Sequence, residues 1–152
     1  MSTTKTKTLL PIPYLFFDGN CGDAIRFYES TFGGTITSMM FYRDLPSDAA
    51  PMDDSLRNAF GDRIMNVQLA LPGGGLIYAS DAHPRMEHHG VHGFSIALNF
   101  DSSDEAGDMF NKLADGGTIT MPFAPTFWAQ GFGMVTDKFG TEWMINGVLN
   151  SM

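Results

Sequence analysis

Apolar positions at the start of the chain predict a strand followed by a helix. A continuous apolar run over residues 9–17 predicts a mostly buried strand. Asn20 follows in a turn and is a good helix N-cap. Four apolar residues then recur at helical spacing, and these are Ala24, Phe27, Tyr28 and Phe32. Gly33 and Gly34 end the expected helix.

Three strands are expected after this helix, and the second half of the chain then has the same order of elements. The first three strands lie at residues 35–42, 63–71 and 76–80. Residues 94–100 alternate between apolar and polar, which predicts a half-buried strand. Ser102 and Glu105 form a capping box before a second apolar helical face, made by Ala106, Met109, Phe110 and Leu113. Further strands are expected at residues 118–121, 133–136 and 142–148.

The two halves are an internal duplication. Phe27 and Phe110 are 83 residues apart, as are the glycine pairs that end the two helices. Gly74 and Gly140, which precede the last strands, are 66 apart, and the difference of 17 equals the length of a polar loop at residues 44–60. The predicted fold is therefore α+β, with two βαβββ modules that form curved mixed sheets. Pairing the modules makes the concavity between the sheets the natural place for a pocket.

The duplication also predicts the domain organisation. We expect one domain at residues 9–152, after a flexible tail at residues 1–8. Its modules, at residues 11–80 and 93–148, are joined by a histidine-rich linker at residues 81–92.

Composition excludes several classes of protein. The chain has 152 residues and a net charge of −8, without a basic cluster, which argues against nucleic-acid binding. No apolar run approaches the roughly 20 residues of a membrane span, and no signal-peptide pattern is present, so a cytoplasmic protein is expected. Cys21 is the only cysteine, which excludes a disulfide framework. Eleven methionines and 13 phenylalanines suit either an irregular core or an adaptable apolar pocket.

Two stretches resemble a known family. PYLFFDGNCGDAIRFYESTFGG, at residues 13–34, and FAPTFWAQGFGMVTDKFGTEWMIN, at residues 123–146, resemble the opening and the close of the PhnB-like branch of the vicinal oxygen chelate superfamily. This superfamily includes glyoxalase I, bleomycin resistance proteins and extradiol dioxygenases. The resemblance implies paired βαβββ modules. It also implies a divalent metal held by His and Glu side chains from the first and last strands of each module.

The metal-binding positions that the resemblance implies do not carry the side chains of the usual site in this chain. They fall at Pro13 (or its neighbours Ile12 and Tyr14), near Tyr78, at Ser95 and at Met144. None of these residues is His, Glu, Asp or Cys, so we expect the usual metal site to be lacking and predict no cofactor.

Other residues are predicted to contact a ligand. Relatives often have histidines where this chain has Asn66 and Gln130, and amides form hydrogen bonds but do not carry protons near neutral pH. Gln68 shares a strand face with Asn66, while Met65, Val67 and Leu69 are expected on the opposite face. The predicted ligand-binding set is Asn66, Gln68, Trp128, Gln130, Glu142 and Met144. We expect the three amides to be the polar contacts of one cavity lined by Met and Phe.

Two further features leave alternatives open. The segment with Asp81, His83, Glu87, His88, His89 and His92 could bind Zn or Ni, or could be a solvated linker. Cys21 follows the Asn20 cap, so a lowered thiol pKa is conceivable, but no base lies near it in the sequence and a structural role is expected.

Three functions fit these observations. The first is a small-molecule-binding protein without a metal, which holds a small apolar or planar ligand. The alternative is a divalent-metal-dependent lyase, isomerase or dioxygenase of the same superfamily. The third is a structural or regulatory dimer without a ligand. A methyltransferase is disfavoured because no strand–glycine–helix site for its cofactor is present. A homodimer is expected because strand edges and apolar faces are left exposed.

Overall fold

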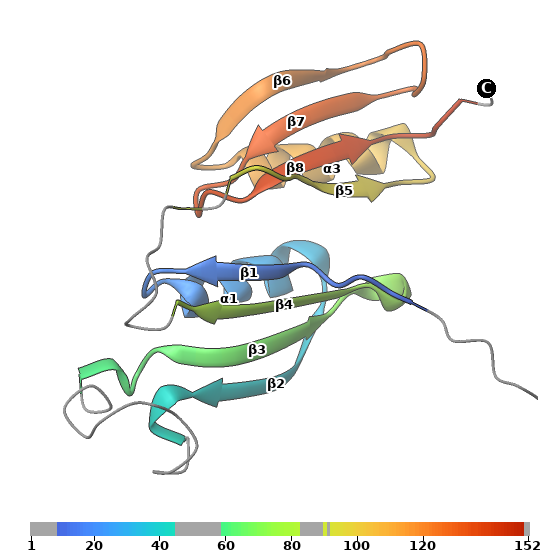
Figure 1. Ribbon diagram of the computed structural model, residues 1–152. Coiled ribbons are helices and arrows are strands. Elements are labelled where there is room, and N and C mark those ends of the chain that lie inside the picture. The colour runs from blue at the N-terminus through green and yellow to red at the C-terminus, as the bar shows by residue number, and fades with distance from the viewer. Residues whose placement is uncertain (1–8, 45–58, 83–89, 91, 151–152) are drawn as a thin grey trace, which may run out of the picture.

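The computed structural model describes residues 9–44, 59–82, 90 and 92–150, and consists of two similar modules (Figure 1). The first module contains β1 (Tyr14–Phe17), α1 (Cys21–Phe32), β2 (Thr35–Phe41), β3 (Ile64–Ala70) and β4 (Leu76–Asp81). The second contains β5 (Ile96–Asn99), α3 (Ser103–Ala114), β6 (Thr118–Ala124), β7 (Phe132–Thr136) and β8 (Glu142–Asn146). The strand orders are β1-β4-β3-β2 and β5-β8-β7-β6. This confirms the predicted α+β fold with two βαβββ modules.

Strand pairing follows the spacing of the duplication. Tyr14 pairs with Tyr78 in the parallel pair β1–β4, and Ala97 pairs with Met144 in the parallel pair β5–β8. The first members of these two pairs are 83 residues apart and the second members are 66 apart. The two modules are therefore equivalent residue by residue wherever these offsets hold.

The first strand is shorter than expected. The apolar run predicted a buried strand over residues 9–17, but β1 begins at Tyr14, and Leu9 and Leu10 are 81% and 75% exposed. Prolines at positions 11 and 13 lack the backbone N–H that a strand donates. Pro13 contributes only its carbonyl, which accepts a hydrogen bond from the Tyr78 N–H at 2.9 Å.

The two helices begin differently. Ser102 caps α3 as predicted, because its hydroxyl accepts a hydrogen bond from the Glu105 N–H at 3.2 Å. Asn20 precedes α1, but its side chain makes no capping hydrogen bond. Asp81 takes this role instead, since its Oδ1 accepts from the N–H groups of Gly19 at 2.8 Å and Cys21 at 3.0 Å.

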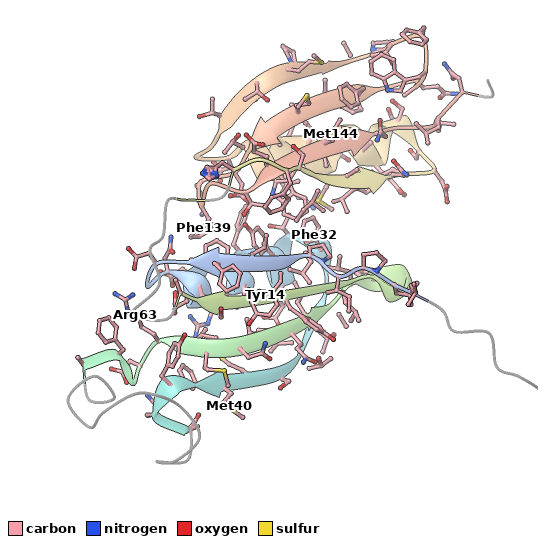
Figure 2. All side chains as sticks on the ribbon, in the orientation of Figure 1. Tyr14, Phe32, Met40, Arg63, Phe139 and Met144 are labelled. Carbon is pink, nitrogen blue, oxygen red and sulfur yellow. The ribbon has the colours of Figure 1, made fainter. Side chains whose placement is uncertain are left out.

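Aromatic side chains join the two modules into one core. Phe27 and Phe32 of α1 lie 5.6 Å from Phe139 and 5.2 Å from Trp143, measured between ring centroids. Figure 2 shows Phe32 and Phe139 in the region between the modules. The Tyr28 hydroxyl donates to Asp137 at 2.7 Å, which places a buried polar contact within this junction. Among the described residues, no helix is long and apolar enough to cross a membrane.

Candidate functional site

Each sheet has one face covered by a helix and one face that no helix covers in the part of the chain that the structure describes. In β1, Leu15 and Phe17 are buried towards α1, whereas Tyr14 and Phe16 are 39% and 40% exposed on the opposite face. In β8, Trp143 and Ile145 are buried, and Met144 between them points the other way. In Figure 1 both helices lie behind their sheets, so the free faces are turned towards the viewer. We call these surfaces the helix-free faces.

A polar and aromatic row crosses the first helix-free face. Ser38, Gln68, Tyr78 and Tyr14 are directly opposed to one another across β2, β3, β4 and β1. The ring of Tyr14 meets that of Tyr78 edge-on, with centroids 6.4 Å apart. The Asn66 Nδ2 donates to the Tyr14 hydroxyl at 3.3 Å. This row therefore offers hydroxyl and amide groups beside aromatic surface.

A thioether row occupies the equivalent place in the second module. Met121, Met134, Met144 and Ala97 are directly opposed across β6, β7, β8 and β5. These positions are equivalent to Ser38, Gln68, Tyr78 and Tyr14 by the offsets of the duplication. Glu142 precedes Met144 by two residues on the same face, and its Oε2 accepts a hydrogen bond from the Ser95 hydroxyl at 3.4 Å.

A comparison with known protein families identifies the fold family. Residues 12–145 match the profile of the Glyoxalase/Bleomycin resistance protein/Dioxygenase superfamily. The chain belongs to this superfamily. It is 40% identical over 144 residues to protein YjdN from Escherichia coli (strain K12), which covers 90% of this chain and 93% of YjdN.

Solved structures agree with this assignment. Protein PA1353 from Pseudomonas aeruginosa is 42% identical, with a TM-score of 0.81 over 93% of this chain and 98% of that one. The PhnB protein from Bacillus cereus is 23% identical and shares the fold, with a TM-score of 0.70 over 91% of this chain and 98% of that one.

The register now defines the opposed positions on the first and last strands of each module. The pairs are Tyr14 with Tyr78 and Ala97 with Met144. Ser95, which the resemblance suggested for the second module, lies two residues before Ala97 and contacts Glu142 instead. Within the described residues, no three His, Cys, Asp or Glu side chains gather in a way that could hold a metal ion.

The predicted ligand-binding residues fall into three places. Asn66 and Gln68 lie on the first helix-free face, and Glu142 and Met144 lie on the second. Trp128 and Gln130 lie in the loop between β6 and β7. Asn66 and Gln130 therefore belong to different modules, and the cavity expected to contain both stays a prediction.

The aromatic loop between β6 and β7 is tied to the C-terminal segment. Trp128 lies 4.9 Å from Phe127 and 5.1 Å from Phe132 between ring centroids. The Gln130 N–H donates to the Val148 carbonyl at 2.8 Å, and the Asn150 N–H donates to the Trp128 carbonyl at 2.7 Å. Phe127 is nonetheless 79% exposed. The loop therefore holds an exposed aromatic side chain on a backbone that is hydrogen-bonded to the C-terminal segment.

One residue of β3 differs from its expected orientation. Met65 was expected on the helix side with Val67 and Leu69, but Ile64 is buried there, at 3% exposure, and Met65 is only half-buried. The cause is a register irregularity, because Met40 pairs with Asn66 while the next residue, Phe41, pairs with Ile64.

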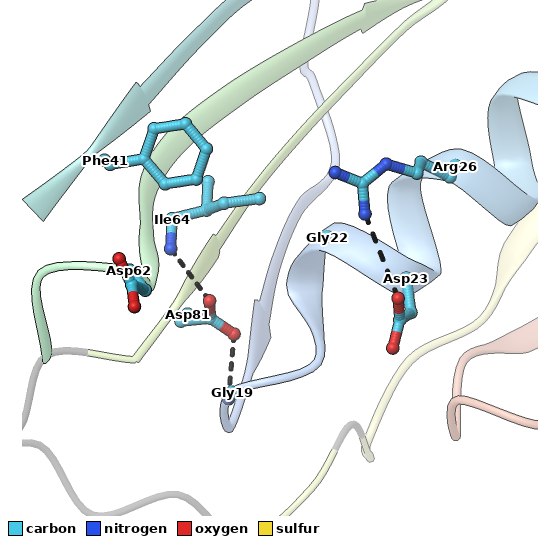
Figure 3. Close-up of a pocket in the computed structure, with 8 residues that line it drawn as sticks. All are labelled: Gly19, Gly22, Asp23, Arg26, Phe41, Asp62, Ile64 and Asp81. Carbon is cyan, nitrogen blue, oxygen red and sulfur yellow. Dashed lines mark hydrogen bonds and ion pairs between the residues drawn. The ribbon is translucent and has the colours of Figure 1, made fainter.

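A polar hollow of about 190 Å³ lies beside the start of α1 (Figure 3). The buried carboxylate of Asp81 lines it and accepts hydrogen bonds from the N–H groups of Gly19, Cys21 and, through Oδ2 at 2.9 Å, Ile64. The expectation that Asp81 belongs to a linker is therefore wrong in this respect, since it ends β4 and is 2% exposed. Three backbone donors satisfy this carboxylate, so its role is to hold the turn, the helix and β3 together.

The structure also bears on Cys21 and on the histidine-rich segment. Cys21 is fully buried, and this burial, followed by the nearby Asp81 carboxylate, raises the thiol pKa rather than lowering it. His83, His88 and His89 lie outside the described residues, as does Glu87. His92 is described and exposed, and together with Tyr14, Phe16 and Phe94 it lines a hollow of about 160 Å³.

Sequence reasoning missed several residues of the helix-free faces. Phe16, Met121 and Met134 were not among the predicted site residues, and Tyr14 and Tyr78 entered only as implied metal positions. Neither β1 (YLFF) nor β7 (FGMVT) alternates between apolar and polar residue types, so the sequence of these strands gave no local signal for the helix-free faces. The pairing across strands could not be read from the sequence, because it depends on the register of each strand.

Proposed function

We propose that this protein binds a small, largely apolar or planar molecule, as a member of the PhnB-like branch of the superfamily that lacks the usual metal site. One observation carries the proposal. The paired positions on the first and last strands hold Tyr14, Tyr78, Ala97 and Met144. Phenols, a methyl group and a thioether contact organic ligands well, but they form a poor ligand set for the divalent metals that such enzymes use.

The first helix-free face supports this role through its mixture of groups. Tyr14, Phe16 and Tyr78 provide rigid aromatic surface, and the Tyr14 and Phe16 ring centroids are 4.9 Å apart. Asn66 and Gln68 add amides that orient a ligand by hydrogen bonds. Amides do not transfer protons near neutral pH, which suits binding rather than acid–base catalysis.

A homodimer is part of the proposal. Exposed large apolar residues lie on the helix-free faces of both modules, with Phe16 and Met40 each 40% exposed and Met121 43% exposed. A second copy would cover these faces and enclose a ligand between them. Light scattering that gives only the 16.6 kDa monomer at micromolar concentrations would contradict this part.

The test combines identification of a ligand with substitution of the polar face. Native mass spectrometry of the untagged protein would reveal copurified small molecules, and elemental analysis would reveal bound metal. For a ligand identified in this way, we expect Asn66→Ala to weaken binding by roughly 0.5–1.5 kcal/mol, the usual worth of one hydrogen bond. Asn111→Ala is the matched control, because Asn111 is exposed on α3, away from the helix-free faces.

Two results would overturn the proposal. One is unchanged ligand affinity in Asn66→Ala and Gln68→Ala alike. The other is a chelator-induced fall of several degrees in the melting temperature that Zn, Ni or Mn restores, because metal binding would then be linked to folding. That second result would favour the metal-dependent lyase, isomerase or dioxygenase.

A further inference from the structure

Three methionines lie directly opposite one another across the second sheet. Met121 of β6 pairs with Met134 of β7, and Met134 pairs with Met144 of β8. Directly opposed residues in neighbouring strands project to the same side of a sheet, and here that side is the helix-free face. Because neighbouring strands are about 4.8 Å apart, the three side chains form one continuous row. We call it the methionine row.

Core packing does not account for all of the methionine row. Met121 is 43% exposed in the edge strand β6, and Met134 and Met144 are only half-buried. Methionine has a flexible side chain, so the two outer sulfurs can lean inwards over Met134. The outer strands β6 and β8 are two strand spacings apart, about 10 Å, which is within reach of two such side chains that lean towards each other.

A negative charge lies next to the methionine row. Glu142 is on the same face of β8, two residues before Met144, and pairs with Thr136 of β7. The Ser95 hydroxyl donates to its Oε2 at 3.4 Å, which favours a fixed position for the carboxylate. Thioethers are uncharged, so this carboxylate would neutralise a monovalent cation bound beside it.

We propose that Met121, Met134 and Met144 form a binding site for a soft monovalent metal ion, Cu(I), with three thioether ligands. Thioether sulfur is a soft ligand that selects Cu(I) over hard divalent ions such as Mg²⁺ and Mn²⁺. The site shares Met144 with the proposed small-molecule function but goes beyond it, because binding of Cu(I) needs no organic ligand. It also differs from the divalent-metal positions of the superfamily, of which it uses only Met144. The equivalent row in the first module, which contains Ser38, Gln68 and Tyr78, has no thioether.

The test is titration of the purified protein with Ag(I), a redox-stable probe for Cu(I), observed through assigned methionine methyl resonances. We expect one equivalent of Ag(I) to shift the methyl signals of Met121, Met134 and Met144 together. Met134→Leu, which removes the central ligand at nearly constant volume, should weaken binding at least tenfold. Met40→Leu is the matched control, because Met40 is similarly exposed, at 40%, on the first sheet. Anaerobic competition for Cu(I) against a colorimetric chelator should rank the variants in the same order.

Additional variants keep the Ag(I) titration interpretable if Cys21 binds the ion or if Met134→Leu changes the fold. The titration is repeated in a Cys21→Ala background, because a thiol also binds Ag(I). Met121→Leu and Met144→Leu provide independent removals of an outer ligand if Met134→Leu changes the melting temperature. The proposal is overturned if these variants bind Ag(I) as tightly as the unaltered protein, or if the shifted methyl signals belong to other methionines. Neither result bears on the binding of an organic ligand to Asn66 and Gln68, so the two proposals fail separately.

Discussion

The helices α1 and α3 occupy equivalent places in the two modules, yet their N-termini are stabilised in different ways. Ser102, directly before α3, caps that helix with its own hydroxyl. The first N–H groups around α1 are bound by Asp81, which is 60 residues away from Cys21 in the chain. The position equivalent to Asp81 in the second module is Gly147, which has no side chain to serve this purpose. Duplicated modules thus keep one backbone while the interactions that stabilise it diverge.

The same divergence separates the two helix-free faces. The first presents hydroxyl, amide and aromatic groups, whereas the equivalent positions of the second present thioethers. Sheet geometry tolerates both, because side chains on an uncovered face are not constrained by packing against a helix. The backbone of a βαβββ module therefore does not by itself define the chemistry of its free face.

The sharpest way to test the comparison between the helices is to remove each capping group. Asp81→Ala leaves the buried N–H groups of Cys21 and Ile64, and the partly buried one of Gly19, without their acceptor and should cost about 3–5 kcal/mol of unfolding free energy. Ser102→Ala removes one partly exposed cap and should cost about 1 kcal/mol. Urea denaturation measures both. Equal losses would show that the distant carboxylate is worth no more than the local cap.

A shared feature of the modules gives the next prediction. A Cβ at Gly34 would lie 2.7 Å from the Ala70 carbonyl oxygen, and a Cβ at Gly117 would lie 2.3 Å from that of Thr136. These contacts are equivalent in the two modules, so Gly34→Ala and Gly117→Ala should each cost about 3 kcal/mol in thermal or urea unfolding. Gly75→Ala is the control, because its Cβ would meet only the Leu71 side chain at 3.4 Å and its φ of −68° suits alanine. Little loss in either variant would contradict the predicted equivalence.

Contacts across the modules distinguish α1 from α3 further. The Tyr28 hydroxyl donates to Asp137 at 2.7 Å and lies 2.8 Å from the Thr141 hydroxyl. Tyr28→Phe keeps the ring but removes these buried contacts, so about 2 kcal/mol of stability should be lost. Tyr78→Phe, on the helix-free face, should leave the unfolding free energy almost unchanged. If the two variants unfold at the same urea concentration, the buried contact between the modules contributes nothing.

Alkaline pH should lower the free energy of unfolding, because two buried residues of α1 resist ionisation. Burial, and then Asp81, raise the pKa of Cys21 above its ordinary 9.0, and burial, and then Asp137, raise the pKa of Tyr28 above 10.0. The stabilisation gained by keeping these two groups neutral is fully present well below pH 9. As the pH rises through 9, the unfolded chain releases protons that the folded chain retains, and the stabilisation is lost. Stability should therefore fall by about 1 kcal/mol between pH 9 and 10 through Cys21, because the unfolded thiol is already half ionised at pH 9, and more steeply once tyrosine ionises in the unfolded chain. Cys21→Ala should flatten the fall between pH 9 and 10 in urea titrations, and an unchanged slope would contradict this assignment.

The sequence predicted the fold better than the site. Helical spacing placed both helices, and the Ser102 cap was recognised because its partner Glu105 is three residues away. Asn20 was wrongly expected to cap α1, since nothing local reveals that Asp81 reaches the same N–H groups from the end of β4. Strand β1 was overextended because the hydrophobicity of the run does not reflect the backbone N–H groups that Pro11 and Pro13 lack.

The sequence predicted only those parts of the candidate site that depend on how side chains alternate between the two faces of a single strand. Asn66 and Gln68 were placed on one face because residues two apart in a strand point the same way. The hydrogen bond between Tyr14 and Asn66 could not be predicted from the sequence, because the two residues are 52 positions apart and β4 lies between their strands. The methionine row was missed for the same reason, since its three members come from three different strands.

The sequence by itself determined the duplicated βαβββ order, the helix positions and the alternation of faces, because these depend on residues close together in the chain. The tertiary structure alone decided which residues meet across strands and which carboxylate caps α1. Those contacts depend on register, and a shift of one residue reverses every side chain of a strand without altering its local pattern. The Tyr14–Tyr78 and Met134–Met144 pairs were thus decided by how the strands align.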